Sequence, residues 1–362
     1  MRPRCCCKIC KERSAKAETF ITKAVRTGER KMSRERGNAA IVGVGGCLPE
    51  KVLTNEELAQ MFSVDAEWIE QRTGIKERRT ADASQAASDL GVVAAERALA
   101  QAGISASEVD LIIVATTLGD MQTPSTACII QERLGIKNVP AFDLSAACTG
   151  FVYALTVGAQ FIANEFYRTI LVIGVDLGSK MVNWSDRDTC ILFADGAGAV
   201  LLRPAKPGYG FLAMQIGADG SGSRSLQIPA GGSRMPVTPE IIEAKLNKVC
   251  MNGFRIFSFA MKKIAEVTEQ ALTSAGIRKE DVNLIIPSQA NLRIIEASMR
   301  LLEFPMEKVM VNLDKYGNMS AASIPIALGE AVADGRIKPG DVIVLTGVGA
   351  GTTWGSIVIR WG

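Results

Sequence analysis

Short apolar segments alternate with longer amphipathic segments along most of this chain. Five of the apolar segments begin at Ala39, Leu111, Ile170, Leu284 and Val342. Short apolar runs between amphipathic stretches are typical of a mostly parallel sheet whose strands are buried between helices. The pattern therefore predicts an α/β fold for the chain after residue 38.

The pattern also repeats within the chain. Residues 98–113 match residues 271–286, and residues 170–174 match residues 343–347, in both cases after 173 positions. Each member of the first pair predicts a helix, a glycine cap and a strand. Two matched segments in one register favour a duplication, and a duplication predicts two similar α/β halves packed together.

The segment 204–209 is rich in proline and glycine, and we place the boundary between the halves there. This gives an N-terminal half of residues 39–206 and a C-terminal half of residues 207–362. Residues 1–38 are basic, polar and without apolar periodicity, which predicts a disordered extension. The extension lacks the apolar core of a secretory signal, and its basic character leaves organellar import as the weaker alternative to a cytoplasmic location.

Composition sets further limits on the function. A chain of 362 residues that is 48% hydrophobic can bury a large core. The net charge is only +3, and much of the basic excess lies in the extension, so charge gives no indication of nucleic-acid binding. No apolar run is long enough to span a membrane. These features predict a globular protein that works away from nucleic acid and without a membrane span.

The chain has nine cysteines and no histidine. Four of the cysteines lie in the extension, and the other five are scattered through apolar surroundings, as is typical of reduced thiols in the cytoplasm. Cys7 and Cys10 have the spacing of a zinc-ligand pair, but no second pair follows them and histidine is absent. We therefore predict no metal site.

Cys148 has the most informative surroundings of these cysteines. It lies in the segment 141–150, where a buried strand passes into a helix, with small residues on both sides. A helix N-terminus lowers the pKa of a cysteine below its free value of about 8.5. Cys148 is therefore a candidate nucleophile, and a buried structural cysteine is the alternative. Because the chain lacks histidine, the usual base partner of a catalytic cysteine is absent.

Five segments in order along the chain resemble β-ketoacyl-[acyl-carrier-protein] synthase III: residues 143–155, 193–199, 287–295, 317–323 and 349–355. The resemblance covers nearly the whole chain from Ala39. It implies the thiolase-like fold, with two duplicated halves in five αβαβα layers, which agrees with the internal repeat. It also implies a homodimeric acyltransferase of the cytoplasm that needs no cofactor and initiates fatty acid synthesis.

The resemblance implies a reaction in two steps. Cys148 takes an acyl group from a coenzyme A thioester, and malonyl on acyl carrier protein is then decarboxylated and attacks the acyl-enzyme. The backbone amides of Cys148 and Ala350 would form the oxyanion hole. In the family, an asparagine and a histidine stabilise the enolate, and these positions are Asn318 and Ser288 here. A serine is shorter, so we expect it to reach the enolate oxygen only through a water molecule.

Loss of one preorganised donor typically lowers a rate by about 10²–10³-fold, so Ser288 is expected to slow decarboxylation much more than acylation. Three interpretations are open at this point. The chain is a weakened condensing enzyme, an acyltransferase that uses Cys148 without decarboxylation, or a catalytically silent homologue. The five ordered motifs favour the first.

The resemblance also implies a coenzyme A site. Trp68 and Arg187 would hold the adenine between them, since a flat ring and a guanidinium both stack on a purine. Arg72 would contact a phosphate, and Gly253 and Asn291 would line the pantetheine tunnel. Without the motifs, Trp68 would be interpreted as an ordinary half-buried aromatic and the arginines as solvated surface charges.

Three further positions concern partners. Gln289 and Arg293 are predicted to dock the acidic acyl carrier protein. Thr123 corresponds to the position where the dimer partner reaches into the acyl pocket. A threonine leaves more room there than a bulky aromatic residue, so we expect tolerance of longer or branched acyl groups. The Gly-rich segment 221–239 is predicted to cover the pocket.

Overall fold

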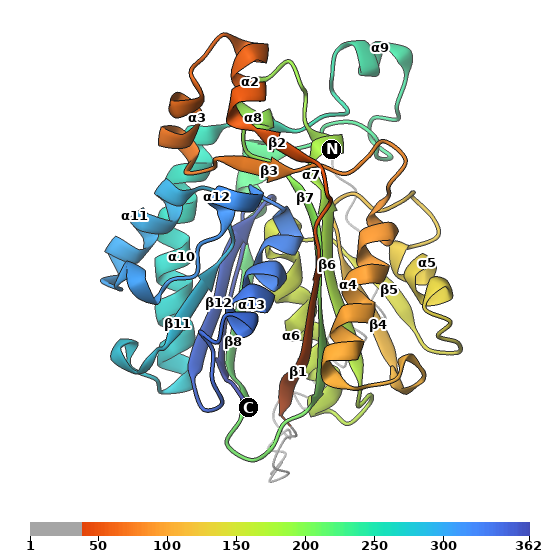
Figure 1. Cartoon of the computed structure of the whole chain (residues 1–362), viewed down its shortest axis with the longest axis vertical. Helices are drawn as coiled ribbons and strands as arrows, with labels where there is room; N and C mark the ends of the chain where they lie inside the picture. The colour runs from red at the N-terminus through yellow and green to blue at the C-terminus, as the bar shows by residue number, and fades with distance from the viewer. Residues whose placement is uncertain (1–37) are drawn as a thin grey trace, which may run out of the picture. The chain divides into compact units, whose positions relative to one another are not determined.

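The structure of the chain is a computed structural model that describes residues 38–362 (Figure 1). The predictions made for the extension, including disorder, import and the cysteines at positions 5, 6, 7 and 10, lie outside the described residues.

The first of two main sheets has five strands in the order β1-β7-β6-β4-β5. They are β1 (Ala39–Cys47), β4 (Leu111–Ala115), β5 (Ala141–Leu144), β6 (Ile170–Leu177) and β7 (Asp195–Pro204). β4 pairs in parallel with β5 and β6, whereas β7 pairs antiparallel with β6 and β1. Every residue of β4 and β6 is buried, which explains why these strands are nearly continuous apolar runs in the sequence.

The second sheet has four strands in the order β11-β12-β13-β8. They are β8 (Gly210–Ala218), β11 (Leu284–Pro287), β12 (Val342–Gly349) and β13 (Thr353–Arg360). β11 pairs in parallel with β12, and the other neighbours are antiparallel. Residues 205–209 carry the chain from the last strand of the first sheet to β8 of the second.

Helices separate and cover the sheets in the predicted five αβαβα layers (Figure 1). The central layer is α6 (Gly150–Ala163) and α13 (Ser323–Ala333), and both sheets pack on it in one hydrophobic core. α4 (Ala87–Ala102) and α5 (Thr126–Arg133) cover the outer face of the first sheet. α10 (Gly253–Ala275) and α11 (Leu292–Leu302) cover the second.

Smaller elements gather mainly at one end of the sheets, at the top of Figure 1. The helices are α2 (Asn55–Phe62), α3 (Ala66–Thr73), α7 (Gly178–Met181), α8 (Arg187–Cys190), α9 (Pro239–Glu243) and α12 (Leu313–Tyr316). Two strand pairs accompany them, β2 (Val52–Thr54) with β3 (Glu77–Arg79), and β9 (Leu226–Gln227) with β10 (Cys250–Met251). A capping box at Thr54 begins α2, and Gly74 ends α3 in the left-handed conformation.

The two central helices begin in the same way. A 3₁₀ turn, Ala147–Thr149, leads into α6, and a second one, Ser320–Ala322, leads into α13. The first residue of each turn has a left-handed backbone, with φ of 48° at Ala147 and 50° at Ser320. These two residues are 173 positions apart, which is the offset of the sequence repeat. The turn before each central helix is thus matched in the two halves, including its strained residue.

Gly174 of β6 sets how closely the second turn approaches the first sheet. A Cβ atom on Gly174 would lie 2.3 Å from the carbonyl oxygen of Ala321. We predict that Gly174→Ala lowers the free energy of unfolding by about 1–3 kcal/mol, because the backbone of the turn must move. In the control Gly329→Ala, nothing lies within 4 Å of the new methyl group in the interior of α13. That variant should gain about 0.5–1 kcal/mol. Urea unfolding measures both, and equal stabilities for the two variants would refute the close approach.

Candidate active site

Cys148 lies in the first of the two matched turns. The strained backbone of Ala147 costs on the order of 1–2 kcal/mol for a residue other than glycine, so the surroundings must hold it in place. The carbonyl of Ala146 accepts hydrogen bonds from the Thr149 hydroxyl at 2.7 Å and from the Thr353 hydroxyl at 3.3 Å. The Thr353 hydroxyl links this turn to β13, so both halves of the chain position the cysteine.

The end of β12 lies directly against this turn. A Cβ atom on Gly349 would be 2.8 Å from the Ala146 oxygen and 3.1 Å from the Cys148 amide nitrogen. Only a glycine allows this approach, and it places the turn that carries Ala350 beside the Cys148 amide. That amide belongs to the first turn of a helical segment, where N–H groups have no intrahelical acceptor.

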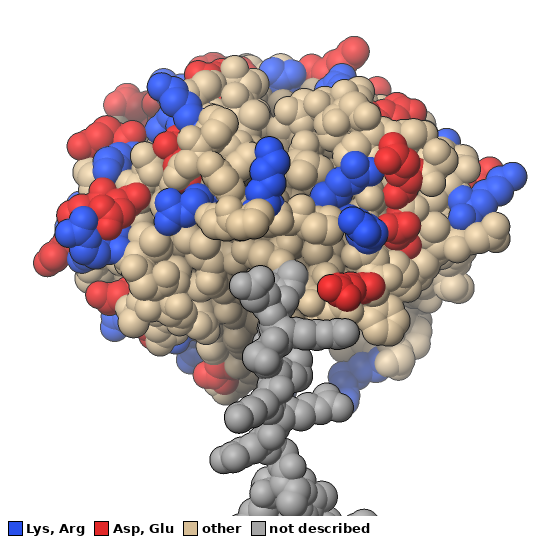
Figure 2. All heavy atoms as spheres, turned by 90° about the horizontal axis from the view of Figure 1, so that it is seen from below, with Lys and Arg blue, Asp and Glu red and all other residues tan. Residues whose placement is uncertain are grey.

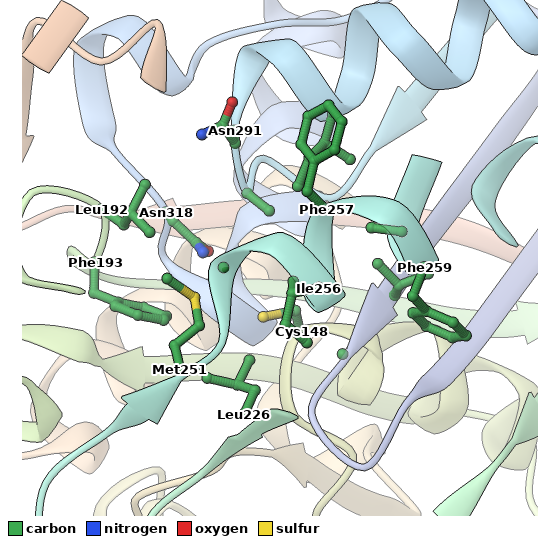
Figure 3. Close-up of a pocket in the computed structure, with 16 residues that line it drawn as sticks. Cys148, Leu192, Phe193, Leu226, Met251, Ile256, Phe257, Phe259, Asn291 and Asn318 are labelled. Carbon is green, nitrogen blue, oxygen red and sulfur yellow. The ribbon is translucent and has the colours of Figure 1, made fainter. Parts of the chain in front are cut away.

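The Cys148 thiol faces an apolar inner cavity of about 120 Å³ (Figure 3). Its wall includes Leu192, Phe193, Leu226, Met251, Ile256, Phe257 and Phe259. An outer cavity of about 540 Å³ shares part of this wall, including Gly253 and Asn291, and reaches Arg72 and Arg293. Because they share wall residues, the two cavities adjoin, and together they are called the passage; its rim carries Asp188 as well as these two arginines.

Burial, with a smaller contribution from the negative charge of Asp176, raises the pKa of the Cys148 thiol to about 11. A hydrogen bond to the Ser320 hydroxyl, at 3.5 Å between Sγ and Oγ, acts in the opposite direction. The prediction that the helix N-terminus lowers this pKa is wrong for the folded chain, because desolvation of the buried thiolate outweighs the helix. At pH 7 only about one thiol in ten thousand is ionised.

Asn318 lines the inner cavity close to Cys148 (Figure 3). Its side-chain oxygen accepts a hydrogen bond of 2.9 Å from the Ser320 amide. This bond orients the carboxamide and leaves its NH₂ group as the end that can donate to a ligand.

Ser288 follows β11 and does not line the inner cavity. Its side chain is buried, with an exposed fraction of 2%, and its hydroxyl has no hydrogen-bond partner within residues 38–362. The hydroxyl faces Gly347, where a Cβ atom would be only 3.0 Å away. The serine thus lies behind the cavity wall.

The predicted coenzyme A residues lie around the outer cavity and its rim. The guanidinium carbons of Arg72 and Arg187 are each 5.1 Å from the centre of the Trp68 ring. A purine between Trp68 and Arg187 needs two stacking distances, about 7 Å, so the pair must separate to admit one. Asn291 caps α11 through the Arg293 amide and donates to the Arg72 carbonyl at 3.0 Å. It therefore joins α3 to α11 as well as lining the passage.

The prediction that Gln289 docks a carrier protein is wrong. The side chain is fully buried, donates to the carbonyls of Pro287 and Met310 and accepts from the Asn312 amide. It ties the end of β11 to the following segment and has no exposed surface to offer. Arg293, four residues later, is exposed at the outer cavity.

Thr123 is exposed and does not line the inner cavity of its own chain. The segment 221–239, predicted to cover the pocket, contains a 3₁₀ helix and β9, and its Leu226 forms part of the cavity wall.

Two polar residues beside the cysteine were not predicted. Asp176 is a carboxylate within the otherwise apolar strand β6. An acidic residue within an apolar run is a signal in the sequence that could have identified it as a candidate functional residue. Ser320 lies within a recognised motif, but no feature of the sequence indicates that it contacts Cys148.

Comparisons with known proteins give one consistent result. Models of the 3-oxoacyl-[acyl-carrier-protein] synthase III family match residues 142–220, and models of its C-terminal part match residues 272–361. The β-ketoacyl-[acyl-carrier-protein] synthase III of Caldanaerobacter subterraneus subsp. tengcongensis is 50% identical over 327 residues, which is 90% of this chain and 99% of the relative. The chain belongs to the β-ketoacyl-[acyl-carrier-protein] synthase III family.

Further relatives agree with this assignment. The synthase III of Symbiobacterium thermophilum is 48% identical over 322 residues, 89% of this chain and 98% of that protein. The crystal structure of the synthase III from Aquifex aeolicus VF5 superposes with a TM-score of 0.83 at 43% identity, covering 89% of this chain and all of that one. The predicted thiolase-like fold is confirmed, as is the prediction of an acyltransferase-type condensing enzyme that initiates fatty acid synthesis.

The structure also bears on membranes, metals and nucleic acid. No helix among residues 38–362 is long and apolar enough to cross a bilayer. The same residues contain no group of three or more His, Cys, Asp or Glu side chains placed to hold a metal ion. The face seen from below in Figure 2 interleaves Lys and Arg with Asp and Glu, rather than presenting the basic patch that binds nucleic acid.

The raised pKa of Cys148 can be measured by the ultraviolet absorbance of the thiolate. We predict that the difference between wild type and Cys148→Ala stays flat up to about pH 10, because the thiol titrates near 11. The same difference measured on the urea-unfolded protein serves as the control and should rise near about pH 8.5, the value of a free cysteine. A midpoint for folded Cys148 below that of the unfolded protein would show that the helix outweighs burial.

Proposed function

We propose that this protein acts through an acyl-Cys148 intermediate. An acyl-coenzyme A thioester acylates Cys148, and malonyl-[acyl-carrier-protein] then loses carbon dioxide and attacks the acyl group. The products are 3-oxoacyl-[acyl-carrier-protein], carbon dioxide and coenzyme A. The passage that ends at the buried thiol is the observation that carries this proposal.

The order of groups along the passage suits a coenzyme A thioester. Trp68 and Arg187 would take the adenine and Arg72 a phosphate at the rim, where exposed cations meet solvent. The pantetheine arm would pass Gly253 and Asn291, and the acyl group would enter the apolar inner cavity. A thiol and backbone donors carry out this chemistry, so the proposal requires no cofactor beyond the thioester substrate.

The second half of the duplication supports an oxyanion hole at Cys148. Ala321 lies 173 positions after Cys148 and occupies the same place in the matched turn. Its amide donates to a carboxylate oxygen of Asp176 at 3.2 Å. Gly349 lies 173 positions after Asp176 and occupies the matching place near Cys148. Because Gly349 has no side chain, a substrate oxygen can take the place that the carboxylate has in the other half. Ala350 would supply the second donor.

The malonyl step is proposed to be the slower one. The NH₂ group of Asn318 is available to the enolate oxygen, whereas the Ser288 hydroxyl lies behind the cavity wall. A carrier protein would deliver malonyl through the same passage, with the exposed Arg293 at the rim steering its acidic surface.

We further propose a cytoplasmic homodimer. β5 is an edge strand of the first sheet, and such strands are normally covered. Met121 lies in the loop before α5 with an exposed fraction of 55%, beside Thr123. These features support a second copy of the chain on this edge. Thr123 would then border the partner's acyl pocket, and its small side chain would leave room for longer or branched acyl groups. The five cysteines of residues 38–362 are free, which supports a reducing compartment.

Carbon dioxide release from malonyl-carrier protein by acylated enzyme tests the proposal. We predict that Ser288→His accelerates release by about 10²–10³-fold, because a longer donor reaches the cavity. The matched control Ser288→Ala should equal wild type, since the hydroxyl does not reach the cavity.

Intact-protein mass spectrometry should show one added acyl group on wild type and none on Cys148→Ala. Absence of acylation in wild type would overturn the proposal. Acylation without carbon dioxide release from wild type or from Ser288→His would instead identify an acyltransferase that does not decarboxylate.

A further inference from the structure

The acylation step needs a base, and the structure offers one that does not involve histidine. The Cys148 thiol donates to the Ser320 hydroxyl at 3.5 Å. The Ser320 side chain lies next to the Asp176 carboxylate, which accepts the amide of the following residue, Ala321, at 3.2 Å and whose pKa the Ser320 side chain lowers. The sulfur, the hydroxyl and the buried carboxylate are thus neighbours in a line contributed by both halves of the duplication.

Asp176 is fully buried at the end of β6. One of its oxygens accepts the Thr117 amide at 2.6 Å, and the other accepts the Ala321 amide at 3.2 Å. The pKa of this carboxyl nevertheless lies above its ordinary value because burial outweighs the hydrogen bonds. The negative charge of Asp176 also raises the pKa of the Cys148 thiol.

Hydrogen bonds of the surrounding backbone hold Ser320 in a strained, left-handed conformation. A φ of 50° is unfavourable for serine, and such strain persists only where neighbouring contacts enforce it. Here the Ser320 amide donates to Asn318, and the next amide, of Ala321, donates to Asp176. These two amide bonds fix the backbone of the turn, and the Ser320 hydroxyl contacts the thiol from it.

We propose that Ser320 and Asp176 form a proton relay for Cys148, an inference that rests on the proposed acyl-Cys148 intermediate. As Sγ attacks the thioester carbonyl, the thiol proton passes to Ser320 Oγ and the Ser320 hydroxyl proton passes to Asp176. The new Sγ–C bond forms and the bond between carbonyl carbon and coenzyme A sulfur breaks. The proton then returns from Asp176 through the same hydroxyl to the departing thiolate, which leaves as coenzyme A thiol.

The relay explains how a thiol with a raised pKa could still be acylated at a useful rate near pH 7. With about one thiol in ten thousand ionised at pH 7, free thiolate alone makes acylation slow. A positioned general base typically contributes about 10²–10⁴-fold, which offsets much of that deficit.

A purely electrostatic role for Asp176 predicts a change in the acylation rate of Asp176→Asn that is opposite to the change the relay predicts. If Asp176 acts only through its negative charge, Asp176→Asn lowers the pKa of the thiol and accelerates acylation. If Asp176 receives the proton, the same substitution slows acylation. The two roles are therefore separated by the sign of the effect.

Single-turnover acylation, followed by mass spectrometry, tests the relay in the full-length chain. Acetyl-, butyryl- and isobutyryl-coenzyme A serve as probes, and the fastest with wild type is used for all variants. Ser320→Ala interrupts the line while keeping the carboxylate, and Asp176→Asn removes the base. Ser323→Ala is the matched control, because it removes a buried hydroxyl of the same segment that bonds only the Met319 amide.

We expect Ser320→Ala and Asp176→Asn to slow acylation at pH 7 by about 10²-fold or more, and Ser323→Ala by less than about twofold. In wild type the rate should level off once Asp176 is ionised. In Ser320→Ala it should rise about tenfold per pH unit toward pH 11, because only free thiolate then reacts. A structural defect would not change the shape of this pH profile.

Faster acylation in Asp176→Asn, or a Ser320→Ala rate and pH profile equal to wild type, would overturn the relay. If Asp176→Asn does not fold, Ser320→Ala decides alone. Failure of wild type to be acylated by any probe would refute the proposed intermediate instead, so the two failures are distinguishable.

Discussion

The structure depends on the close approach of the two duplicated halves at the turns that begin α6 and α13. Glycines make this approach possible. Gly349 lies against the Cys148 amide, and Gly174 lies against the Ala321 carbonyl, at distances that exclude any side chain. This approach buries the cysteine, raises its pKa and brings Ser320 of one half to the sulfur of the other.

The duplication explains why only one of the two matched turns is proposed to react. Both turns share a left-handed first residue and aim an amide at the end of a strand from the opposite half. In the second turn a carboxylate satisfies that amide, and in the first a glycine leaves it open. The difference between Asp176 and Gly349 therefore separates a closed structural turn from one able to receive a substrate oxygen.

Much of this architecture could be predicted from the sequence. Apolar runs gave the buried strands, because a parallel sheet covered on both faces requires them, and the repeat gave the two-half organisation. The motifs predicted Cys148, Asn318 and the residues proposed to bind coenzyme A. Local sequence could not give the pKa of Cys148, because burial depends on walls contributed by distant segments such as 251–259. Nor could it show that Gln289 faces inward while Arg293 is exposed, since a strand end and a helix start meet within five residues.

The central claim is that the open amide of Cys148, together with that of Ala350, receives the oxygen of the reacting acyl group. The most direct measurement is a crystal structure of the acylated enzyme. The account predicts an acyl carbonyl oxygen within about 3.1 Å of both amide nitrogens, the separation expected of oxyanion-hole donors. A carbonyl oxygen directed away from both amides, toward Asn318 or into the passage, would contradict it.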